Sequence, residues 1–326
     1  MDVLEKKINH NEREDNKLKS IKGLIGKKKF NWRLYSMALP ALVLLAVFSY
    51  WPMFGLVLAF KDFNFKEGIL GSPWNEPLFN HFELLYTSPD AINAVKNTLI
   101  LNFSFIIIGT VCAIGLAIML NEVKHNGFKK ITQSITFLPF FMSWVVVGAF
   151  LAEILSYDNG VINRFMVMLG QERISFYMEP KYWPTILIIE SVWKGMGYNA
   201  VVYLAAISGI DGSYYEAASI DGATRLQKIR YITLPLLQPT IIILVLLALG
   251  RIMNADFGMF YYSTKGLYSL WETTDVIDVF IYRGLRVTGN IGISSAAGFF
   301  QSVISLGVVV TFNALAKKMD KDSALF

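Results

Sequence analysis

Residues that carry chemistry in most enzymes are scarce in this chain of 326 residues. It has one cysteine, Cys112, and three histidines, His10, His81 and His125, so neither an internal disulfide nor a zinc site built from these residues is available. No Gly-x-x-x-x-Gly-Lys-Ser/Thr segment occurs, and the nearest match, residues 23–29, lacks the spacing and the Ser/Thr. The chain therefore has no loop of the kind with which many ATPases hold phosphates.

Charge is scarce too, and apolar residues take its place. Charged residues make up 17% of the chain and hydrophobic residues 54%, with a mean hydropathy of +0.45, whereas soluble proteins average about 25% charged. A helix needs about 20 apolar residues to cross a membrane, and six runs have this length. We therefore expect an all-α polytopic membrane protein with six transmembrane helices. The runs are approximately 34–60, 97–120, 132–155, 184–208, 232–253 and 293–316.

The distribution of Lys and Arg predicts how these spans are oriented. With residues 1–33 inside, the inner segments hold 19 of the 30 Lys and Arg residues, and the longer outer segments hold nine. Because positive residues concentrate on the cytoplasmic side, both termini should be cytoplasmic. Inner-loop Lys and Arg also account for the net charge of +5, so nucleic acid is not an expected partner.

Both ends of the chain are polar. Residues 1–33 form a basic segment that we expect to stay attached, since the first apolar run is much longer than that of a signal peptide. Leu18 and Ile21 among lysines suit an amphipathic helix on the inner leaflet, and a disordered tail suits the same residues. A six-span domain, residues 34–316, and a cytoplasmic tail, residues 317–326, complete the expected organisation.

A polar segment on the predicted cytoplasmic side, residues 211–231, separates two apolar runs. Ser213 lies three residues before Glu216, a spacing that predicts a capping box at the start of a short helix. Gly222 supplies a turn that permits positive φ, and Thr224 can start a second short helix. The segment is therefore predicted to form a helix-turn-helix projection.

This loop contains a spaced pattern. Glu216-Ala217-Ala218 is followed after three residues by Gly222 and after nine more by Ile232-x-Leu234-Pro235. The pattern resembles the EAA loop of bacterial ABC-importer permeases at every position and both spacings. Three other segments are similar to polysaccharide- and oligosaccharide-uptake permeases, namely 193–210, 274–283 and 296–303. The resemblance extends from about residue 30 to the C-terminus.

The resemblance implies a type I ABC-importer permease architecture with a cytoplasmic coupling helix, located in the bacterial cell membrane. It assigns Glu216, Ala217, Ala218 and Gly222 to the contact with an ATPase. It also implies a second permease subunit, two ATPase subunits and an extracytoplasmic solute-binding protein as partners, with an oligosaccharide as the solute. ATP-Mg would bind to the ATPase subunits, and this chain would hold no cofactor.

Candidate solute contacts lie inside one apolar run. They are not carried over from the larger maltose permease subunit, because this chain lacks its large periplasmic insertion and extra N-terminal spans. Glu190 and Lys194 stand one turn apart in the order that favours an ion pair, with Trp193 beside Lys194. Asn199 and Tyr203 follow on the same predicted helix. These residues either line a path for a hydroxyl-rich solute or include a structural pair between helices.

A secondary transporter for a small polar solute is the alternative function. Such a protein usually carries internal repeats and coupling-ion carboxylates near the membrane midplane, whereas this sequence offers one polar pair. A membrane-embedded enzyme would need a convergent cluster of acid, base, nucleophile or metal ligands, and the sequence shows none.

Overall fold

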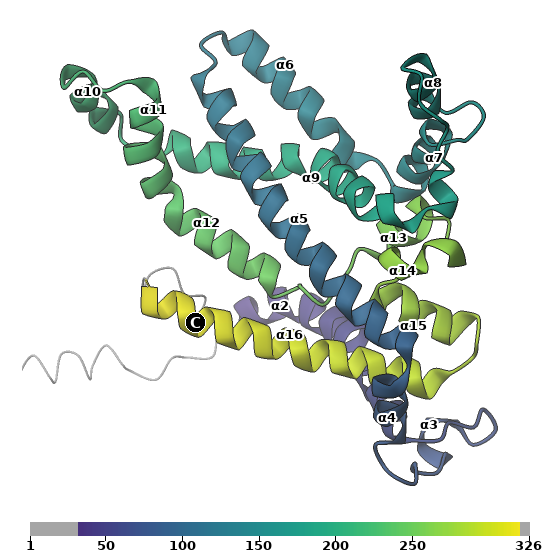
Figure 1. Ribbon diagram of the computed structural model, residues 1–326. Helices are drawn as coiled ribbons and strands as arrows, with labels where there is room; N and C mark the ends of the chain where they lie inside the picture. The colour runs from purple at the N-terminus through teal and green to yellow at the C-terminus, as the bar shows by residue number, and fades with distance from the viewer. Residues whose placement is uncertain (1–31, 320–326) are drawn as a thin grey trace, which may run out of the picture. The chain divides into compact units, whose positions relative to one another are not determined.

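The structure, a computed structural model, describes residues 32–319 (Figure 1). This part of the chain is helical apart from an isolated β-bridge between Lys61 and Trp74. The all-α prediction is therefore confirmed for it. The predicted basic segment at the N-terminus, up to residue 31, and the last seven residues of the predicted tail lie outside the described residues.

The described residues divide into two compact units, with the boundary between residues 54 and 55. The first contains α2 (Trp32–Leu45), which passes through a π-helical turn, Ala46–Tyr50, into a 3-10 helix, Trp51–Phe60, that ends in the second unit. Most described side chains of α2 and the π-helical turn are exposed and apolar. Such a surface suits a helix in contact with lipid or another hydrophobic surface.

Within residues 55–319, the second unit contains four long α-helices and ten short ones. The long helices are α5 (Pro89–Glu122), α9 (Trp183–Ser208), α12 (Leu234–Leu249) and α16 (Ile291–Met319). The short helices are α3 (Gly68–Gly71), α4 (Asn80–Thr87), α6 (Asn126–Phe137), α7 (Trp144–Ile154), α8 (Val161–Met168), α10 (Gly212–Ile220), α11 (Arg225–Lys228), α13 (Phe257–Ser263), α14 (Trp271–Thr274) and α15 (Ile277–Arg286).

The candidate membrane spans agree in part with the six predicted from sequence. Within residues 32–319, four helices are long and apolar enough to cross a membrane, namely Ser36–Phe60, Pro89–Glu122, Arg225–Leu249 and Ile291–Leu315. A bent pair, α6 with its 3-10 extension and α7, supplies a fifth if it crosses as one span. α9 has 26 residues but is not among them, and its apolar run is interrupted by polar residues such as Glu190 and Lys194. A polytopic all-helical membrane protein is confirmed, and the sixth span remains a prediction.

The predicted span 132–155 is not one straight helix. A bend of 99° separates Asn126–Phe141 from Trp144–Ile154. The sequence explains the break, because Pro139 lies in the first turn of a short 3-10 helix, where its ring cannot continue the preceding α-helix. After the break, the Ser143 side chain accepts a hydrogen bond from the Val146 N–H and so caps α7.

α9 is fixed by close packing against α5, α6 and α12. Where it meets α5, Ala113, Ala117 and Ala200 are fully buried, and small residues of this kind let helix backbones approach each other. On α6, the Thr136 carbonyl lies so close to Gly197 that a Cβ atom at residue 197 would not fit. These contacts set the rotation of α9 and therefore the directions in which its polar residues point.

Residues 254–290, here called the cap segment, form α13, α14 and α15 and are bonded to α5. The Asn97 side-chain amide donates to the Asp275 carbonyl at 3.1 Å, and the Thr98 hydroxyl accepts from the Ile277 N–H at 2.9 Å. Asn97 and Thr98 are buried, so their side chains supply hydrogen bonds to backbone groups of the cap segment that water does not reach. The helix thus holds the cap segment in one position.

A second set of polar contacts stabilises the cap segment from within and from α16. Arg283 makes two hydrogen bonds to the Asp275 carboxylate, at 3.0 and 2.8 Å, and its guanidinium lies 3.5 Å from the ring centroid of Trp271. Gln301 of α16 donates to the Asp278 carboxylate at 3.2 Å. Asp275 is 2% exposed, so its charge depends on Arg283.

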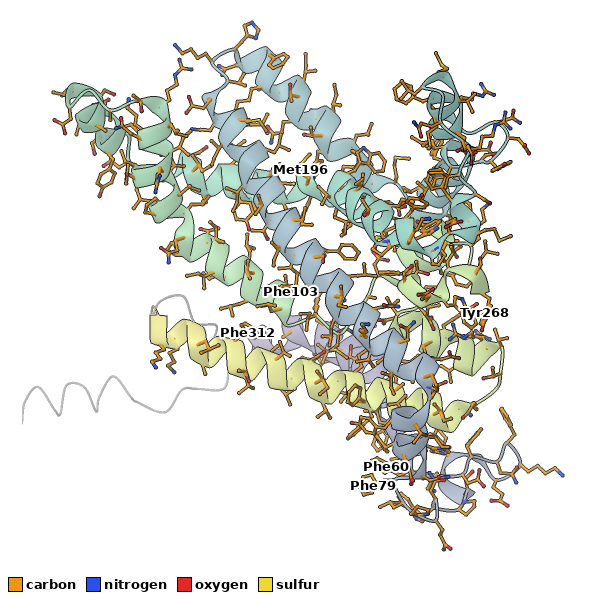
Figure 2. All side chains as sticks on the ribbon, in the orientation of Figure 1. Phe60, Phe79, Phe103, Met196, Tyr268 and Phe312 are labelled. Carbon is orange, nitrogen blue, oxygen red and sulfur yellow. The ribbon has the colours of Figure 1, made fainter. Side chains whose placement is uncertain are left out.

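Aromatic packing joins the end of the 3-10 helix Trp51–Phe60 to α4 and α16. Phe60 and Phe79 lie close together (Figure 2). The Phe60 ring centroid lies 5.7 Å from that of Phe79, 5.3 Å from that of Phe82 and 5.6 Å from that of Phe299. These separations are typical of edge-to-face and tilted aromatic pairs.

Candidate functional site

The 211–231 loop connects α9 to α12 and contains α10 and α11. The helix-turn-helix prediction is confirmed, but the predicted capping box between Ser213 and Glu216 is wrong. Asp211 caps α10 instead, because its Oδ1 accepts from the Ser213 N–H at 2.9 Å. This hydrogen bond holds the pKa of Asp211 below its usual range. Glu216 is exposed.

The turn after α10 has the geometry that the sequence predicts. Gly222 has φ of +77°, and the Ala223 N–H donates to the Ala218 carbonyl at 2.9 Å, which closes the end of the helix. Thr224 then starts α11 through a capping box with Gln227. The Thr224 N–H donates to Gln227 Oε1 at 2.7 Å, and the Gln227 N–H donates to Thr224 Oγ1 at 3.3 Å.

Two side-chain hydrogen bonds join the parts of the loop. Lys228 Nζ of α11 donates to Ser219 Oγ of α10 at 2.6 Å. The Tyr215 and Thr233 hydroxyls are 3.0 Å apart and share a hydrogen bond. Thr233 lies in the π-helical turn Ile229–Thr233, which continues into α12. α10 and α11 are therefore connected to each other and to the helix that follows.

The surface of the loop is open. Ile220 is 86% exposed, Leu226 74% and Tyr214 55%. Glu216 and Ala217 are exposed as well. Apolar side chains gathered on a polar projection are typical of a surface that another protein covers.

Glu190 and Lys194 do not form the ion pair that their spacing suggests. Glu190 is 6% exposed, its Oε1 accepts from the Ser263 hydroxyl of α13 at 2.6 Å, and its Oε2 has no hydrogen-bond partner in the described structure. Lys194 Nζ donates to the Phe140 carbonyl at 2.9 Å and to the Pro139 carbonyl at 3.4 Å. The Pro139 carbonyl also accepts from the Met142 N–H at 3.1 Å, and both carbonyls lie at the end of the 3-10 helix Leu138–Phe141, where carbonyl groups are open to a cation.

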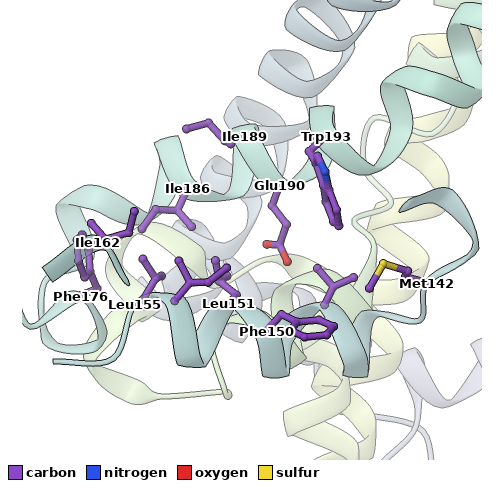
Figure 3. A pocket seen from close by; sticks show the side chains of 12 residues that line it. Met142, Phe150, Leu151, Leu155, Ile162, Phe176, Ile186, Ile189, Glu190 and Trp193 are labelled. Carbon is purple, nitrogen blue, oxygen red and sulfur yellow. The ribbon is translucent and has the colours of Figure 1, made fainter. Parts of the chain in front are cut away.

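A cavity of about 590 Å³ lies between α7, α8 and α9, and Glu190 points into it (Figure 3). Its other lining residues are apolar or aromatic, including Phe150, Leu151 and Trp193. A site for a hydroxyl-rich solute needs several polar groups around the ligand. This cavity therefore matches a sugar poorly.

The five predicted path residues divide between two sides of α9. Glu190, Trp193 and Lys194 share one face, and Trp193 is 44% exposed. Asn199 and Tyr203 lie toward the opposite face at the spacing of a 3.6-residue helix. Asn199 is exposed, whereas Tyr203 is 2% exposed within the core between α5, α9 and α12.

The structure adds an aromatic stack beside Lys194 that the sequence analysis missed. The rings of Tyr198 and Phe140 are parallel within 10°, with centroids 4.4 Å apart. Phe137 stacks on both, with centroids 6.0 and 5.9 Å away. Tyr198 follows Lys194 by four residues, and Pro139 predicts a helix end, so both signals were present in the sequence.

Known proteins similar to this chain are membrane components of transport systems. Residues 106–321 match the family described as "Binding-protein-dependent transport system inner membrane component". The polygalacturonan/rhamnogalacturonan transport system permease protein YteP of Bacillus subtilis (strain 168) is 35% identical over 289 residues, which cover 89% of each chain. Protein LplB of the same organism is 32% identical over 304 residues, which cover 93% of this chain and 94% of LplB.

Two solved structures share the fold. A chain of a bacterial ABC transporter involved in the import of the acidic polysaccharide alginate matches with a TM-score of 0.82 and 37% identity, covering 91% of this chain and 99% of that one. The alginate transporter in complex with alginate pentasaccharide-bound periplasmic protein matches with a TM-score of 0.80 and 37% identity, covering 89% and 96%. These likenesses decide against a secondary transporter. The chain belongs to the family of binding-protein-dependent transport system inner membrane components and is the permease subunit, not the ATPase, of an ABC transporter.

Proposed function

We propose that this chain forms half of the membrane pathway of an ATP-driven importer that takes an oligosaccharide from an external solute-binding protein into the cytoplasm. A second permease subunit supplies the other half, and two ATPase subunits bind ATP-Mg. The relatives support this solute class, because one is named for polygalacturonan/rhamnogalacturonan and two solved structures for alginate.

The observation that carries the proposal is the exposed 211–231 loop with its complete EAA spacing. Ala217 and Ala218 have small side chains, so a partner surface can come close to the α10 backbone. Glu216 is exposed beside them, and Gly222 sets the direction of the turn. We assign these four residues to the contact with an ATPase subunit.

The connections of the loop supply a route by which movement of the ATPase reaches the membrane. α9 ends at Ser208, four residues before α10 begins, and the helix Arg225–Leu249 runs from the loop into the bundle. α9 and α12 share a buried core with α5. A shift of the loop therefore moves packed helices as a body, which suits rocking between inward- and outward-open states.

The proposed topology has six spans, with the bent α6–α7 pair and α9 counted as one each. In α9, Glu190 bonds to Ser263 and Lys194 to backbone carbonyls, so neither polar side chain needs to face lipid. The charge distribution favours both termini in the cytoplasm. A reporter that is active only outside the cytoplasm should give no signal when fused after Lys318, and a strong signal would contradict this topology.

Among the candidate path residues, we favour Trp193 and Lys194 as solute contacts. Trp193 is 44% exposed, and Lys194 lies near the ring of Phe140, which stacks on the exposed Tyr198 ring. The exposed Asn199 belongs to the other side of α9 and is a weaker candidate. Buried Glu190 and Tyr203 fit structural roles better.

ATP hydrolysis by the reconstituted complex tests the proposed function. The complex is placed in proteoliposomes with its binding protein, which is either empty or loaded with an oligogalacturonate. Loaded binding protein should stimulate hydrolysis and drive uptake of the oligosaccharide. Hydrolysis that is unaffected by loading, in a complex that contains all its subunits, would contradict ATP-driven sugar import.

A further inference from the structure

We propose that Lys194 binds a carboxylate of the transported saccharide and so makes the pathway selective for acidic sugars. The proposal rests on the proposed function, since it names the solute chemistry of the same pathway. It is carried by three features of the described structure: a cation that forms no ion pair, carbonyls that hold it in place, and an exposed aromatic surface beside it.

Lys194 is a half-buried cation without a carboxylate partner. The three ion pairs within residues 32–319 are Arg173 with Asp158, Lys181 with Glu179 and Arg283 with Asp275. Asp256, the acidic residue bonded to neighbouring Trp144, acts on Lys194 electrostatically from a distance, but it caps α13 and forms no ion pair with Lys194. The positive charge of Lys194 is therefore not neutralised by a direct contact within the described chain.

The surroundings of Lys194 fix the position of the ammonium group but leave it with binding capacity. It donates to two carbonyls of the break before α7, those of Pro139 and Phe140. An ammonium group has three N–H donors, so one remains. Nζ also lies 5.0 Å from the Trp144 ring centroid and 5.7 Å from that of Phe140. A charge held in this way, partly desolvated, interacts with an anion more strongly than one in water.

The adjacent aromatic surface suits the body of a sugar. Tyr198 is 44% exposed and Phe140 41%. Their rings stack in parallel, and Tyr198 lies about one helical turn after Lys194 on α9. Apolar faces of sugar rings pack on aromatic rings, while the cation takes the charged substituent. A neutral sugar would use only the aromatic part of such a site, and a uronate would use both parts.

A purely structural role for Lys194 is the competing explanation, because the ammonium group also caps the carbonyls at the end of α6. That role predicts reduced stability on replacement but no change in the preference between acidic and neutral sugars. The preference, expressed as a ratio of affinities, therefore separates solute binding from helix capping.

The test compares trigalacturonate with the same trisaccharide after reduction of its carboxylates to alcohols. Binding of each probe to the purified complete transporter in nanodiscs is measured by calorimetry, without binding protein, for wild type, Lys194→Gln and Lys194→Arg. Lys181→Gln is the matched control, because Lys181 is a lysine paired with Glu179 outside this site. Gel filtration checks that each variant complex is assembled.

We expect wild type to prefer trigalacturonate and Lys194→Gln to lose about tenfold in affinity for it, with little change for the neutral trisaccharide. Lys194→Arg should retain part of the preference, and Lys181→Gln all of it. If Lys194→Gln fails to assemble, the wild-type affinity for trigalacturonate alone must fall with added KCl. An unchanged acidic-to-neutral ratio in Lys194→Gln, or no salt dependence in wild type, would overturn the role of Lys194 while leaving sugar import intact. If the wild-type transporter binds neither trisaccharide and loaded binding protein does not stimulate its ATP hydrolysis, the proposed function itself is contradicted.

Discussion

The 211–231 loop and the cap segment both lie between long helices, but their hydrogen bonds are satisfied in different ways. In the loop, the caps are local, with Asp211 at the start of α10 and Thr224 at the start of α11. The cap segment also has a local cap, Asp256 of α13, but further bonds come from the long helices, through Asn97 and Thr98 of α5 and Gln301 of α16.

This difference separates the expected roles of the two segments. A loop that satisfies its own backbone can keep its shape while its outer surface binds another protein and moves with it. A segment whose bonds reach into the helical bundle is part of the folded core, so its loss destabilises the bundle. Substitutions should therefore impair folding in the cap segment and coupling in the loop.

The largest effect on stability should follow from Arg283→Met. The substitution leaves buried Asp275 without its guanidinium partner, which costs about 3–5 kcal/mol when a buried pair is broken. Thermal unfolding of the purified complex measures the loss. Arg173→Met is the control, since the Arg173–Asp158 pair is 3.6 Å apart with side chains 42% and 80% exposed and should contribute less than about 1 kcal/mol. Equal losses would show that the cap segment is not part of the core.

Gly222→Val should remove transport without removing the protein from the membrane. Gly222 has φ of +77° and no heavy atom within 4 Å of where a Cβ would lie, so valine meets backbone strain rather than a clash. The strain changes the direction of the loop, and ATP hydrolysis should no longer respond to loaded binding protein. Uptake and ATPase assays on the reconstituted complex measure both effects.

A glycine elsewhere in the chain provides a close control for this substitution. Gly170 has φ of +76° and equally open surroundings, so Gly170→Val introduces the same strain outside the loop. It should leave coupling nearly normal, as should Gly222→Asn, because asparagine tolerates positive φ better than other residues. Equal loss of transport in both valine variants would mean that the strain, and not the loop, is responsible.

Asp211→Ala should have a smaller effect, confined to α10. Loss of the cap weakens the first turn of the helix, which should increase hydrogen exchange of the first α10 amides without unfolding the bundle. Ser213→Ala should increase exchange less than Asp211→Ala, because the Ser213 backbone N–H, which the substitution keeps, makes the capping bond to Asp211. Faster exchange in Ser213→Ala than in Asp211→Ala would indicate that Ser213, and not Asp211, caps α10.

The smallest effect concerns the coupling between Glu190 and Lys194. Because the two side chains contact different partners, the stability losses of Glu190→Gln and Lys194→Gln should add to within about 0.5 kcal/mol in the double variant. Melting curves of the four proteins measure this coupling. A value above about 1 kcal/mol would indicate that the residues form an ion pair in the assembled transporter.

Local sequence signals predicted local structure well. Thr224 and Gln227 form the capping box that starts α11, and Gly222 adopts positive φ. The start of α10 was predicted incorrectly, because Asp211 and Ser213 are both good capping residues two positions apart. Sequence preference alone does not choose between them.

Contacts between distant segments could not be predicted in the same way. Glu190 hydrogen-bonds to Ser263, 73 residues away, and Lys194 to carbonyls 54 and 55 residues away. The i to i+4 spacing of Glu190 and Lys194 favours their pairing in an isolated helix, but here tertiary partners for both side chains replace it. The break at Pro139, which supplies those carbonyls, was the available sequence signal.

Site-specific photo-crosslinking tests most directly whether the 211–231 loop contacts the ATPase. A photoreactive residue replaces either Ile220 or Leu70. Ile220 is 86% exposed on the loop, and Leu70 is 94% exposed in a segment predicted to lie on the external side of the membrane. Irradiation of the assembled complex should link residue 220, but not residue 70, to an ATPase subunit. Linkage from residue 70 and none from residue 220, in a complex whose ATPase subunits remain bound, would contradict the account.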